Sequence, residues 1–205
     1  MKILSILAAA SGLLFLSAEA ALGPWGPLVK MVPAAALGLM VLGDSRRAGA
    51  RLAGVGLLVS SLADAAIEYS FIAGLGTFLV AHLCYIAAFT RVETGWRLAR
   101  LAPVALWAVL VLPALASGAG ALRAPVLIYA AAIFAMIWRA AAAARSISIQ
   151  DPGIIGLFGA ILFGVSDTLL GVNRFVTPIP AADLIVLGSY WAAQALIAAS
   201  FLRGR

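Results

Sequence analysis

The chain has 205 residues, of which 64% are hydrophobic and only 11% are charged, and its mean hydropathy is +1.11. A soluble domain of this size has no interior large enough to bury so many apolar side chains, so the composition indicates a polytopic membrane protein. The formal charge of +6 does not indicate a nucleic-acid partner, because the basic residues are spread along short loops. The single cysteine, Cys84, excludes an internal disulfide.

Eight apolar segments are long enough, or nearly so, to be spanning helices, since a bilayer requires about 20 mainly apolar residues. In chain order they cover residues 3–21, 27–43, 51–67, 70–89, 97–117, 123–140, 153–171 and 181–202. Glycines and prolines punctuate the gaps, and no polar linker is long enough to separate two soluble domains. The sequence therefore predicts one all-α transmembrane domain over residues 1–205.

The basic residues predict the direction of these helices. In an eight-helix arrangement, most lysines and arginines fall on one side, which the positive-inside rule places in the cytoplasm together with both termini. These residues are Lys2, Arg46, Arg47, Arg51, Arg91, Arg97, Arg100, Arg139, Arg145, Arg203 and Arg205. Lys30, Arg123 and Arg174 fall on the other side. We therefore expect eight spans in a cytoplasmic membrane, of the bacterial inner type.

The N-terminal segment has a second interpretation. Lys2, the apolar stretch after it and Ala18-Glu19-Ala20 are also typical of a cleavable signal peptide. However, the remaining chain is itself multi-spanning and needs no cleaved signal. A retained first helix also restores the even helix count that places both termini inside.

Two aspartates interrupt the apolar runs. Asp64 and Asp167 each lie eight residues after a glycine, in Gly56-LLVSSLA-Asp64 and Gly159-AILFGVS-Asp167. A charge in the bilayer centre costs at least ~2.5–3.5 kcal/mol on insertion scales, so an acid there is a functional candidate. Each lies about 13 or 14 residues from the inner end of its helix, or roughly 20 Å at 1.5 Å per residue, so the two can face one cavity. The alternative for Asp64 is an acid that reaches the headgroups.

The same two segments predict an internal repeat. Four helices separate them, so both run from inside to outside. Residues 1–90 and 97–205 would then be two parallel four-helix repeats related by an axis along the membrane normal. Matches between glycines and aliphatic residues are frequent in this composition, so chance similarity stays the alternative.

Other polar residues are candidates for substrate binding or positioning. Glu19 and Lys30 flank the outer turn between the first two helices, either as a simple ion pair or at the mouth of a cavity. There Lys30 would attract a phosphate as a point charge. His82 and Tyr85 share one helix face at i, i+3. A lone histidine among apolar residues is more often a packing residue than a catalyst.

The last two helices carry a further set. Asn173 and Arg174 follow Asp167 toward the outer end, and the alternative for Asp167 is an ion pair with Arg174 or Lys30 that only fixes packing. Tyr190 and Gln194 lie at i, i+4 and either orient a carboxylate or bridge helices. There is no glycine-rich phosphate loop, no His-x-x-Glu-His and no cysteine pair, so neither a cofactor nor a metal site is predicted.

Four stretches together resemble the YhhN family of integral membrane lysoplasmalogenases. They are Leu57-Leu58 to Asp64, Gly74 to Ile86, Gly159 to Phe175, and Tyr190 to Ser200. The most specific parts are Ala-His-x-x-Tyr and Ser-Asp-x-Leu-Leu-x-x-Asn-Arg-Phe. One departure occurs in the second segment, where the family pattern is a Lys-Pro pair and this chain has Lys30 followed by Met31, Val32 and Pro33.

The resemblance implies hydrolysis of the vinyl ether bond of a lysoplasmalogen, a lysophospholipid, to a fatty aldehyde and a glycerophospho-base. This reaction requires one acid that protonates the β-carbon of the enol ether and one carboxylate that activates water, and two carboxyls in unequal surroundings can divide these tasks. Asp64 and Asp167 are therefore predicted as the acid/base pair, with either as the proton donor.

The remaining candidates then take supporting roles. Tyr190 and His82 would position the aspartates, and Lys30, Asn173 or Arg174 would contact the phosphate. A rival interpretation is a small transporter or lipid-binding membrane protein that uses the same acids as a proton or headgroup site, because paired intramembrane carboxylates and parallel repeats also occur in transporters. A purely structural bundle would leave both acids unexplained.

Overall fold

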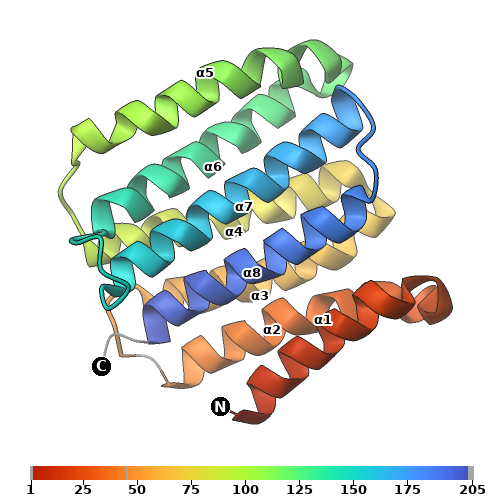
Figure 1. Cartoon of the computed structure of the whole chain (residues 1–205), viewed down its shortest axis with the longest axis horizontal. Coiled ribbons are helices and arrows are strands. Elements are labelled where there is room, and N and C mark those ends of the chain that lie inside the picture. The colour runs from red at the N-terminus through yellow and green to blue at the C-terminus, as the bar shows by residue number, and fades with distance from the viewer. Residues whose placement is uncertain (1, 45, 203–205) are drawn as a thin grey trace.

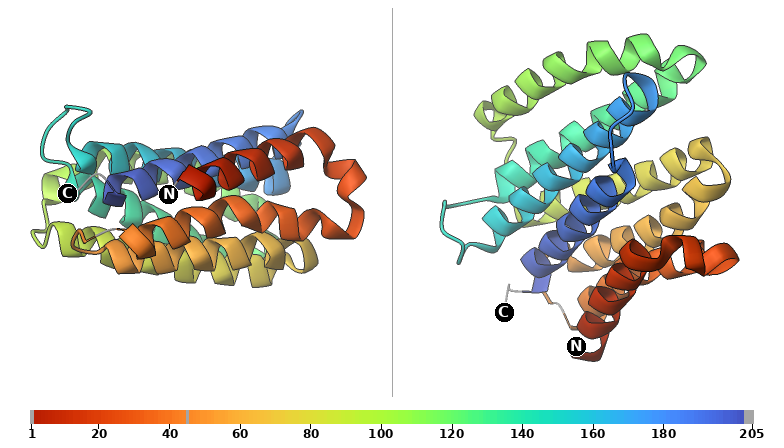
Figure 2. Two further views of the ribbon diagram at one scale, coloured as in Figure 1. Left: turned by 90° about the horizontal axis from the view of Figure 1, so that it is seen from below. Right: turned by 45° about the vertical axis from the view of Figure 1, so that its right-hand side comes forward.

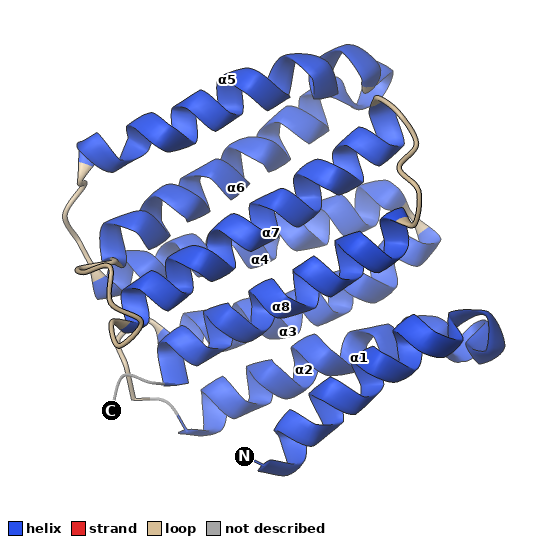
Figure 3. Cartoon of the chain, in the orientation of Figure 1, coloured by secondary structure: helices blue, strands red, loops and turns tan. Residues whose placement is uncertain are grey.

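The computed structural model describes residues 2–44 and 46–202, and within these ranges it contains eight α-helices and no β-strand (Figure 3). The helices are α1 (Lys2–Leu22), α2 (Gly26–Asp44), α3 (Ala50–Tyr69), α4 (Phe71–Val92), α5 (Leu101–Gly118), α6 (Arg123–Ala143), α7 (Pro152–Phe175) and α8 (Ala182–Leu202). Short 3-10 turns precede three of them: η1 (Gly23–Trp25), η2 (Leu98–Arg100) and η3 (Gly120–Leu122). The all-α prediction is confirmed, and each predicted segment corresponds to one helix.

Most helices of the bundle are long and apolar enough to span a membrane. Within the described ranges, seven segments are long and apolar enough to cross a membrane. They are Gly23–Gly43, Ala50–Tyr69, Phe71–Val92, Leu98–Gly118, Gly120–Ala143, Pro152–Phe175 and Ala182–Leu202. The first helix, α1, is not among them, so seven of the eight expected spans have this support.

The helices alternate in direction, which places their connections at two opposite ends of the bundle. The start of α1, the end of α8 and the connections α2–α3, α4–α5 and α6–α7 lie at one end, on the left of Figure 1. We call this the basic end, because its connections carry Arg46, Arg47, Arg97, Arg100 and Arg145. The connections α1–α2, α3–α4, α5–α6 and α7–α8 lie at the opposite end.

Helices that follow one another in the chain pack side by side within each half of the bundle. The two halves meet mainly where α4 packs on α6 and where α8 packs on α2 and α3. Seen from below, α1 and α8 lie on the opposite side of the bundle from α2 and α3 (Figure 2). As a result α3 is enclosed by α2, α4 and α8, and α7 lies among α5, α6 and α8. These are the two helices that carry Asp64 and Asp167.

Small residues allow the closest of these contacts. On α7, a Cβ added at Gly159 would lie 2.9 Å from the backbone nitrogen of Ile197 and 3.0 Å from the carbonyl oxygen of Ala193. On α3, a Cβ at Gly56 would lie 2.6 Å from the ring of Tyr85. Glycine is thus required for helix approach at these points, as is common between helices in lipid.

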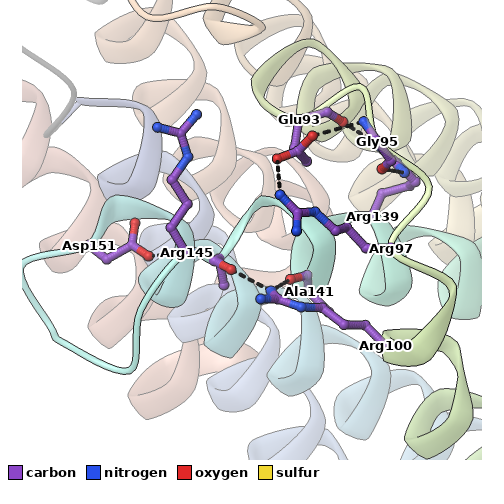
Figure 4. Close-up of polar contacts among 9 residues, drawn as sticks. Glu93, Gly95, Arg97, Arg100, Arg139, Ala141, Arg145 and Asp151 are labelled. Atoms are coloured by element: carbon purple, nitrogen blue, oxygen red, sulfur yellow. Dashed lines mark hydrogen bonds and ion pairs between the residues drawn. The ribbon is translucent and has the colours of Figure 1, made fainter.

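Arginines of the basic end also satisfy helix C-termini, as Figure 4 shows. Arg139 is buried and donates hydrogen bonds to the carbonyls of Glu93 and Gly95, just beyond the end of α4. Arg100 donates to the carbonyl of Ala141 in the last turn of α6. The last carbonyls of a helix have no partner within the helix. These side chains therefore have a structural role in addition to the topological role that the sequence indicates.

The connection between α6 and α7 is organised by Asp151 (Figure 4). Its carboxylate accepts hydrogen bonds from the backbone N–H groups of Arg145, Ser146 and Gly153, at 2.6, 2.8 and 2.8 Å, and so caps α7. Partial burial acts to raise the pKa of Asp151, but these backbone donors and the nearby charge of Arg47 outweigh it and hold the pKa below its ordinary value.

Gly49 fixes the connection between α2 and α3 against α4. Its φ is +82°, and a Cβ there would lie 2.2 Å from the carbonyl oxygen of Ala88. Gly49→Ala is therefore expected to destabilise the protein by about 2–4 kcal/mol, through backbone strain and steric overlap. Thermal unfolding in detergent measures the effect. Gly43→Ala is the control, because a Cβ at Gly43 meets nothing within 4 Å; equal losses in both variants would contradict the explanation.

Candidate functional site

A cavity of about 220 Å³ lies between α2, α3, α4, α7 and α8, toward the end of the bundle opposite the basic end. The segments named in the sequence analysis contribute both acids to it. Its charged and hydrogen-bonding lining includes Lys30, Asp64, Glu68, Asp167, Asp183 and Tyr190. The structure therefore brings Asp64 and Asp167 to one space, although 103 positions separate them in the chain. We call this space the acidic cavity.

Asp64 lies on α3 and is only 2% exposed. Its Oδ2 atom accepts a hydrogen bond of 2.9 Å from the hydroxyl of Tyr190 on α8. The ring of Tyr190 is held edge-on against Phe78 and Phe163, with centroid distances of 5.6 and 5.3 Å. Because aromatic packing fixes this ring, the hydroxyl of Tyr190 orients the carboxyl of Asp64.

Asp167 lies on α7 and is held from two other helices. The hydroxyl of Tyr129 on α6 donates a 2.6 Å hydrogen bond to its Oδ2 atom. The Nε2 atom of His82 on α4 lies 3.2 Å from the same hydroxyl and 3.7 Å from the same carboxyl oxygen. His82 is completely buried. Tyr129 and His82 thus approach one oxygen of Asp167 and restrict its orientation.

Lys30 lies at the start of α2 and pairs with Glu68, which follows Asp64 by one helical turn. The Nζ–Oε1 distance is 2.5 Å, and the Glu68 side chain is 40% exposed. The sequence predicts Glu19 and Lys30 either as an ion pair or at the mouth of a cavity, and the Glu19 side chain lies outside the described part of the structure. The lysine therefore provides a positive charge within the acidic cavity, beside an acid that is partly accessible.

Tyr85 lies beneath the cavity rather than in its lining. Its hydroxyl donates to Oε1 of Gln194 at 2.8 Å and lies 3.2 Å from Oγ of Ser60, so it joins α3, α4 and α8. Gln194 accordingly bridges helices, and Tyr190 alone of the predicted α8 pair orients a carboxylate.

Asn173 and Arg174 lie away from the acidic cavity. The side-chain oxygen of Asn173 accepts a hydrogen bond from the backbone N–H of Ile179 and so holds the connection after α7. The guanidinium of Arg174 lies 4.0 Å from the ring centroid of Phe71. The alternative of an ion pair that fixes packing is therefore wrong for both named partners. Asp167 is engaged by Tyr129 rather than by Arg174, and Lys30 pairs with Glu68.

Sequence reasoning missed two residues of the site. Tyr129 contacts Asp167 directly, and Asp183 lines the acidic cavity at the start of α8. The available signal for Tyr129 was a tyrosine deep in a spanning helix, whose hydroxyl requires a partner once it is buried. Asp183 resembled an ordinary acid in the first turn of a helix, which is favourable there without any function.

The site combines a buried carboxyl and a partly buried one, each hydrogen-bonded by a tyrosine from another helix, with a lysine in the same cavity. These features define a polytopic helical membrane protein with an acidic cavity between its helices. The chain belongs to the YhhN family, whose model matches residues 25–201.

Three curated relatives that match the chain share the name lysoplasmalogenase. The chain is 34% identical to lysoplasmalogenase TMEM86B of Sus scrofa over 182 residues, which cover 85% of this chain and 74% of the relative. It is 32% identical to lysoplasmalogenase TMEM86B of Homo sapiens, with coverage of 72% and 62%. It is 33% identical to a lysoplasmalogenase of Mycobacterium bovis, with coverage of 67% and 53%. The match thus spans between about half and three quarters of these relatives. No solved structure matches the chain.

Proposed function

We propose that this protein hydrolyses the vinyl ether bond of lysoplasmalogens in the acidic cavity, releasing a fatty aldehyde and a glycerophospho-base. The relatives named lysoplasmalogenase support the substrate class. The observation that carries the proposal is that Asp64 and Asp167 line one cavity while other helices hold each of them in place.

The reaction needs a proton donor and a base that activates water, and two carboxyls can supply both. The surroundings of the two acids differ. Asp64 is almost fully buried and receives its hydrogen bond from Tyr190. Asp167 is approached by Tyr129 and His82. Unequal surroundings of this kind allow one carboxyl to stay protonated while its neighbour is ionised.

The charged groups of the acidic cavity also fit a zwitterionic lipid headgroup. Lys30 provides a positive point charge for the phosphate. Glu68 and Asp183 line the same cavity and match the positive charge of a headgroup amine. A lipid held in this way places the bond next to its glycerol close to the two aspartates.

The proposed membrane topology has eight spans, with both termini in the cytoplasm of a bacterial cell. The concentration of arginines at the basic end supports this orientation through the positive-inside rule. The packing also supports two parallel repeats, α1–α4 and α5–α8. If the two repeats are equivalent, the contact of α4 with α6 must have a counterpart between α8 and α2. Both contacts occur.

The test uses purified protein in detergent with three lysolipids of the same glycerophospho-base that differ at position 1: a 1-alkenyl ether, a 1-alkyl ether and a 1-acyl ester. Aldehyde release from the 1-alkenyl lipid alone is the expected result. In D₂O, the aldehyde should carry one deuterium at its α-carbon, because the enzyme forms that C–H bond. Binding of the lipid without aldehyde release would instead favour a transporter or lipid-binding protein.

Tyr129 is expected to position Asp167 for this reaction. Tyr129→Phe removes a 2.6 Å hydrogen bond to the carboxyl while leaving the ring in place. Loss of one hydrogen bond to the carboxyl group lowers a rate by roughly 10- to 100-fold. We expect this decrease in kcat, with little change in KM. Tyr69→Phe is the matched control, because the Tyr69 side chain is exposed. A rise in KM with unchanged kcat would show that Tyr129 binds substrate instead.

A further inference from the structure

An open hollow of about 600 Å³ lies at the basic end, between the connection of α2 with α3 and the last turn of α4. We call it the arginine hollow. Its lining is Arg46, Arg47, Ala48, Gly49, Ala50, Arg51, Leu52 and Arg91. Among the described residues that line it, four are arginines and none is acidic. The hollow therefore has an excess of positive charge, in contrast to the acidic cavity toward the other end of the bundle.

Only one of the four guanidinium groups has a described structural role. Arg47 donates a hydrogen bond to the carbonyl of Ser200 on α8, and the charge of Asp151 acts on it as well. The other three are exposed and form no ion pair with any residue that the structure describes; they are Arg46, Arg51 and Arg91. The positive-inside rule accounts for arginines at this end, but it does not require that four of them line one hollow.

The start of α3 adds backbone donors to the same place. Gly49 is its N-cap residue, and no described side chain caps the helix there. The first N–H groups of a helix have no partner within the helix and lie at the positive end of its dipole. Arg51 and Leu52 belong to this first turn and line the hollow. Guanidinium groups beside a helix N-terminus are a suitable set of donors for a phosphate group.

The hollow lies at the level where the apolar spans end. Three segments that can cross a membrane begin or end beside it: Gly23–Gly43, Ala50–Tyr69 and Phe71–Val92. The polar headgroups of a bilayer form a layer directly outside the hydrocarbon core. The phosphates of the leaflet at the basic end therefore lie at the depth of these arginines.

Exposed apolar side chains continue from the hollow toward the middle of the spans. Val55 and Leu62 follow Arg51 at i+4 and i+11, so they share its face of α3, and they are 42% and 57% exposed. On α4, Val80 precedes Arg91 by 11 residues and is 49% exposed. Each stripe extends roughly 16 Å from its arginine at 1.5 Å per residue, which is about half of a hydrocarbon core of about 30 Å. These two apolar stripes thus have the length of one leaflet.

We propose that the arginine hollow binds the phosphate of an anionic phospholipid from the leaflet at the basic end, with its acyl chains along the two apolar stripes. The amine of a zwitterionic headgroup finds no carboxylate among the described lining, so a headgroup of net negative charge is preferred. The bound lipid joins the connection before α3 to the end of α4, where Gly49 already holds the two together. This site is separate from the acidic cavity and does not depend on the proposed hydrolysis.

Three probes test the site on wild-type protein purified in a neutral detergent: phosphatidylglycerol, phosphatidylcholine with the same acyl chains, and glycerol 3-phosphate. Native mass spectrometry gives the apparent Kd of each lipid, and the thermal midpoint is measured with all three probes. We expect phosphatidylglycerol to bind most tightly and to raise the midpoint, because a ligand of the folded state stabilises it. Equal effects of phosphatidylcholine would overturn the preference for an anionic lipid. An equal rise with glycerol 3-phosphate would show a site for free phosphate instead.

A charge-matched pair of double variants locates the binding. Arg51→Gln with Arg91→Gln removes two exposed arginines of the hollow. At about fivefold for each arginine near an anionic headgroup, we expect the Kd for phosphatidylglycerol to rise by roughly 25-fold. Arg97→Gln with Arg145→Gln is the control, since it removes the same charge from the same end but outside the hollow, and it should bind almost as the wild type does.

Two results would contradict the proposal. An equal loss of binding in both double variants would show diffuse attraction of the lipid to the basic end. Unchanged binding in the Arg51 and Arg91 double variant would show that the lipid lies elsewhere. Midpoints without lipid show whether each variant folds, and where the double variant does not, Arg91→Gln alone is used with an expected rise in Kd of about fivefold. Aldehyde release is not a readout here, so the outcome is independent of the proposed function.

Discussion

Asparagine in place of Asp64 or Asp167 is expected to lower aldehyde release from lysoplasmalogen by roughly 10²–10⁴-fold, the usual contribution of a general acid or base. The amide keeps the size of the side chain and its ability to accept a hydrogen bond from Tyr190 or Tyr129. However, it neither transfers a proton to carbon nor accepts one from water. Initial rates with purified, folded variants measure the effect.

A variant with asparagine at both Asp64 and Asp167 tests whether the two acids act together. Because the two acids act in one reaction, we expect the double variant to be little slower than the worse single variant. Glu93→Gln serves as the control, since Glu93 lies at the basic end and interacts with Gly95 and Arg97. Near wild-type turnover in a folded Asp64→Asn or Asp167→Asn variant would show that the role assigned to that aspartate is wrong.

Arg139→Gln is expected to destabilise the protein by about 2–4 kcal/mol. The Arg139 side chain is buried and donates to the carbonyls of Glu93 and Gly95 and to the hydroxyl of Thr90. Glutamine cannot reach this set of acceptors, and each buried acceptor left without a partner costs about 1–3 kcal/mol. The midpoint of thermal unfolding in detergent measures the loss.

The matched control for Arg139 is Arg97→Gln at the same end of the bundle. The Arg97 side chain is 58% exposed and contacts Glu93 at i, i+4, a pair worth only about 0.3–0.5 kcal/mol. If the two variants had similar midpoints, the basic end would be held mainly by helix packing, and the hydrogen bonds of Arg139 would carry little of its stability.

The sequence predicted the helices well because their signal is local. About 20 apolar residues are needed to cross the bilayer, so each helix was visible as one segment. Asp64 and Asp167 were visible for a related reason: a carboxyl in an apolar run is costly, and few residues of this chain have that property. Their matching depth followed from the rise per residue, so the spacing along each helix was enough to predict a shared cavity.

The partners of these acids could not be predicted in the same way, because they lie on other helices. Tyr129 is 38 positions from Asp167, and Lys30 is 38 positions from Glu68. Periodicity within one helix indicates a face but not which neighbour covers it. The same limit explains Asn173 and Arg174. They follow Asp167 in sequence, but rotation by about 100° per residue turns Asn173 away from the face of the acid. Arg174 returns to nearly the same face but lies two turns, or roughly 10 Å, nearer the end of the helix.

The hydrogen bond between Tyr190 and Asp64 also has a consequence for biogenesis. The donor lies 126 residues after the acceptor, on the last helix of the described chain. A ribosome delivers α3 to the membrane well before α8, so Asp64 must wait in the bilayer without this partner during synthesis. Maturation of the site is therefore coupled to the arrival of α8, because before then the carboxyl of Asp64 has only groups of earlier helices, such as Lys30, around it.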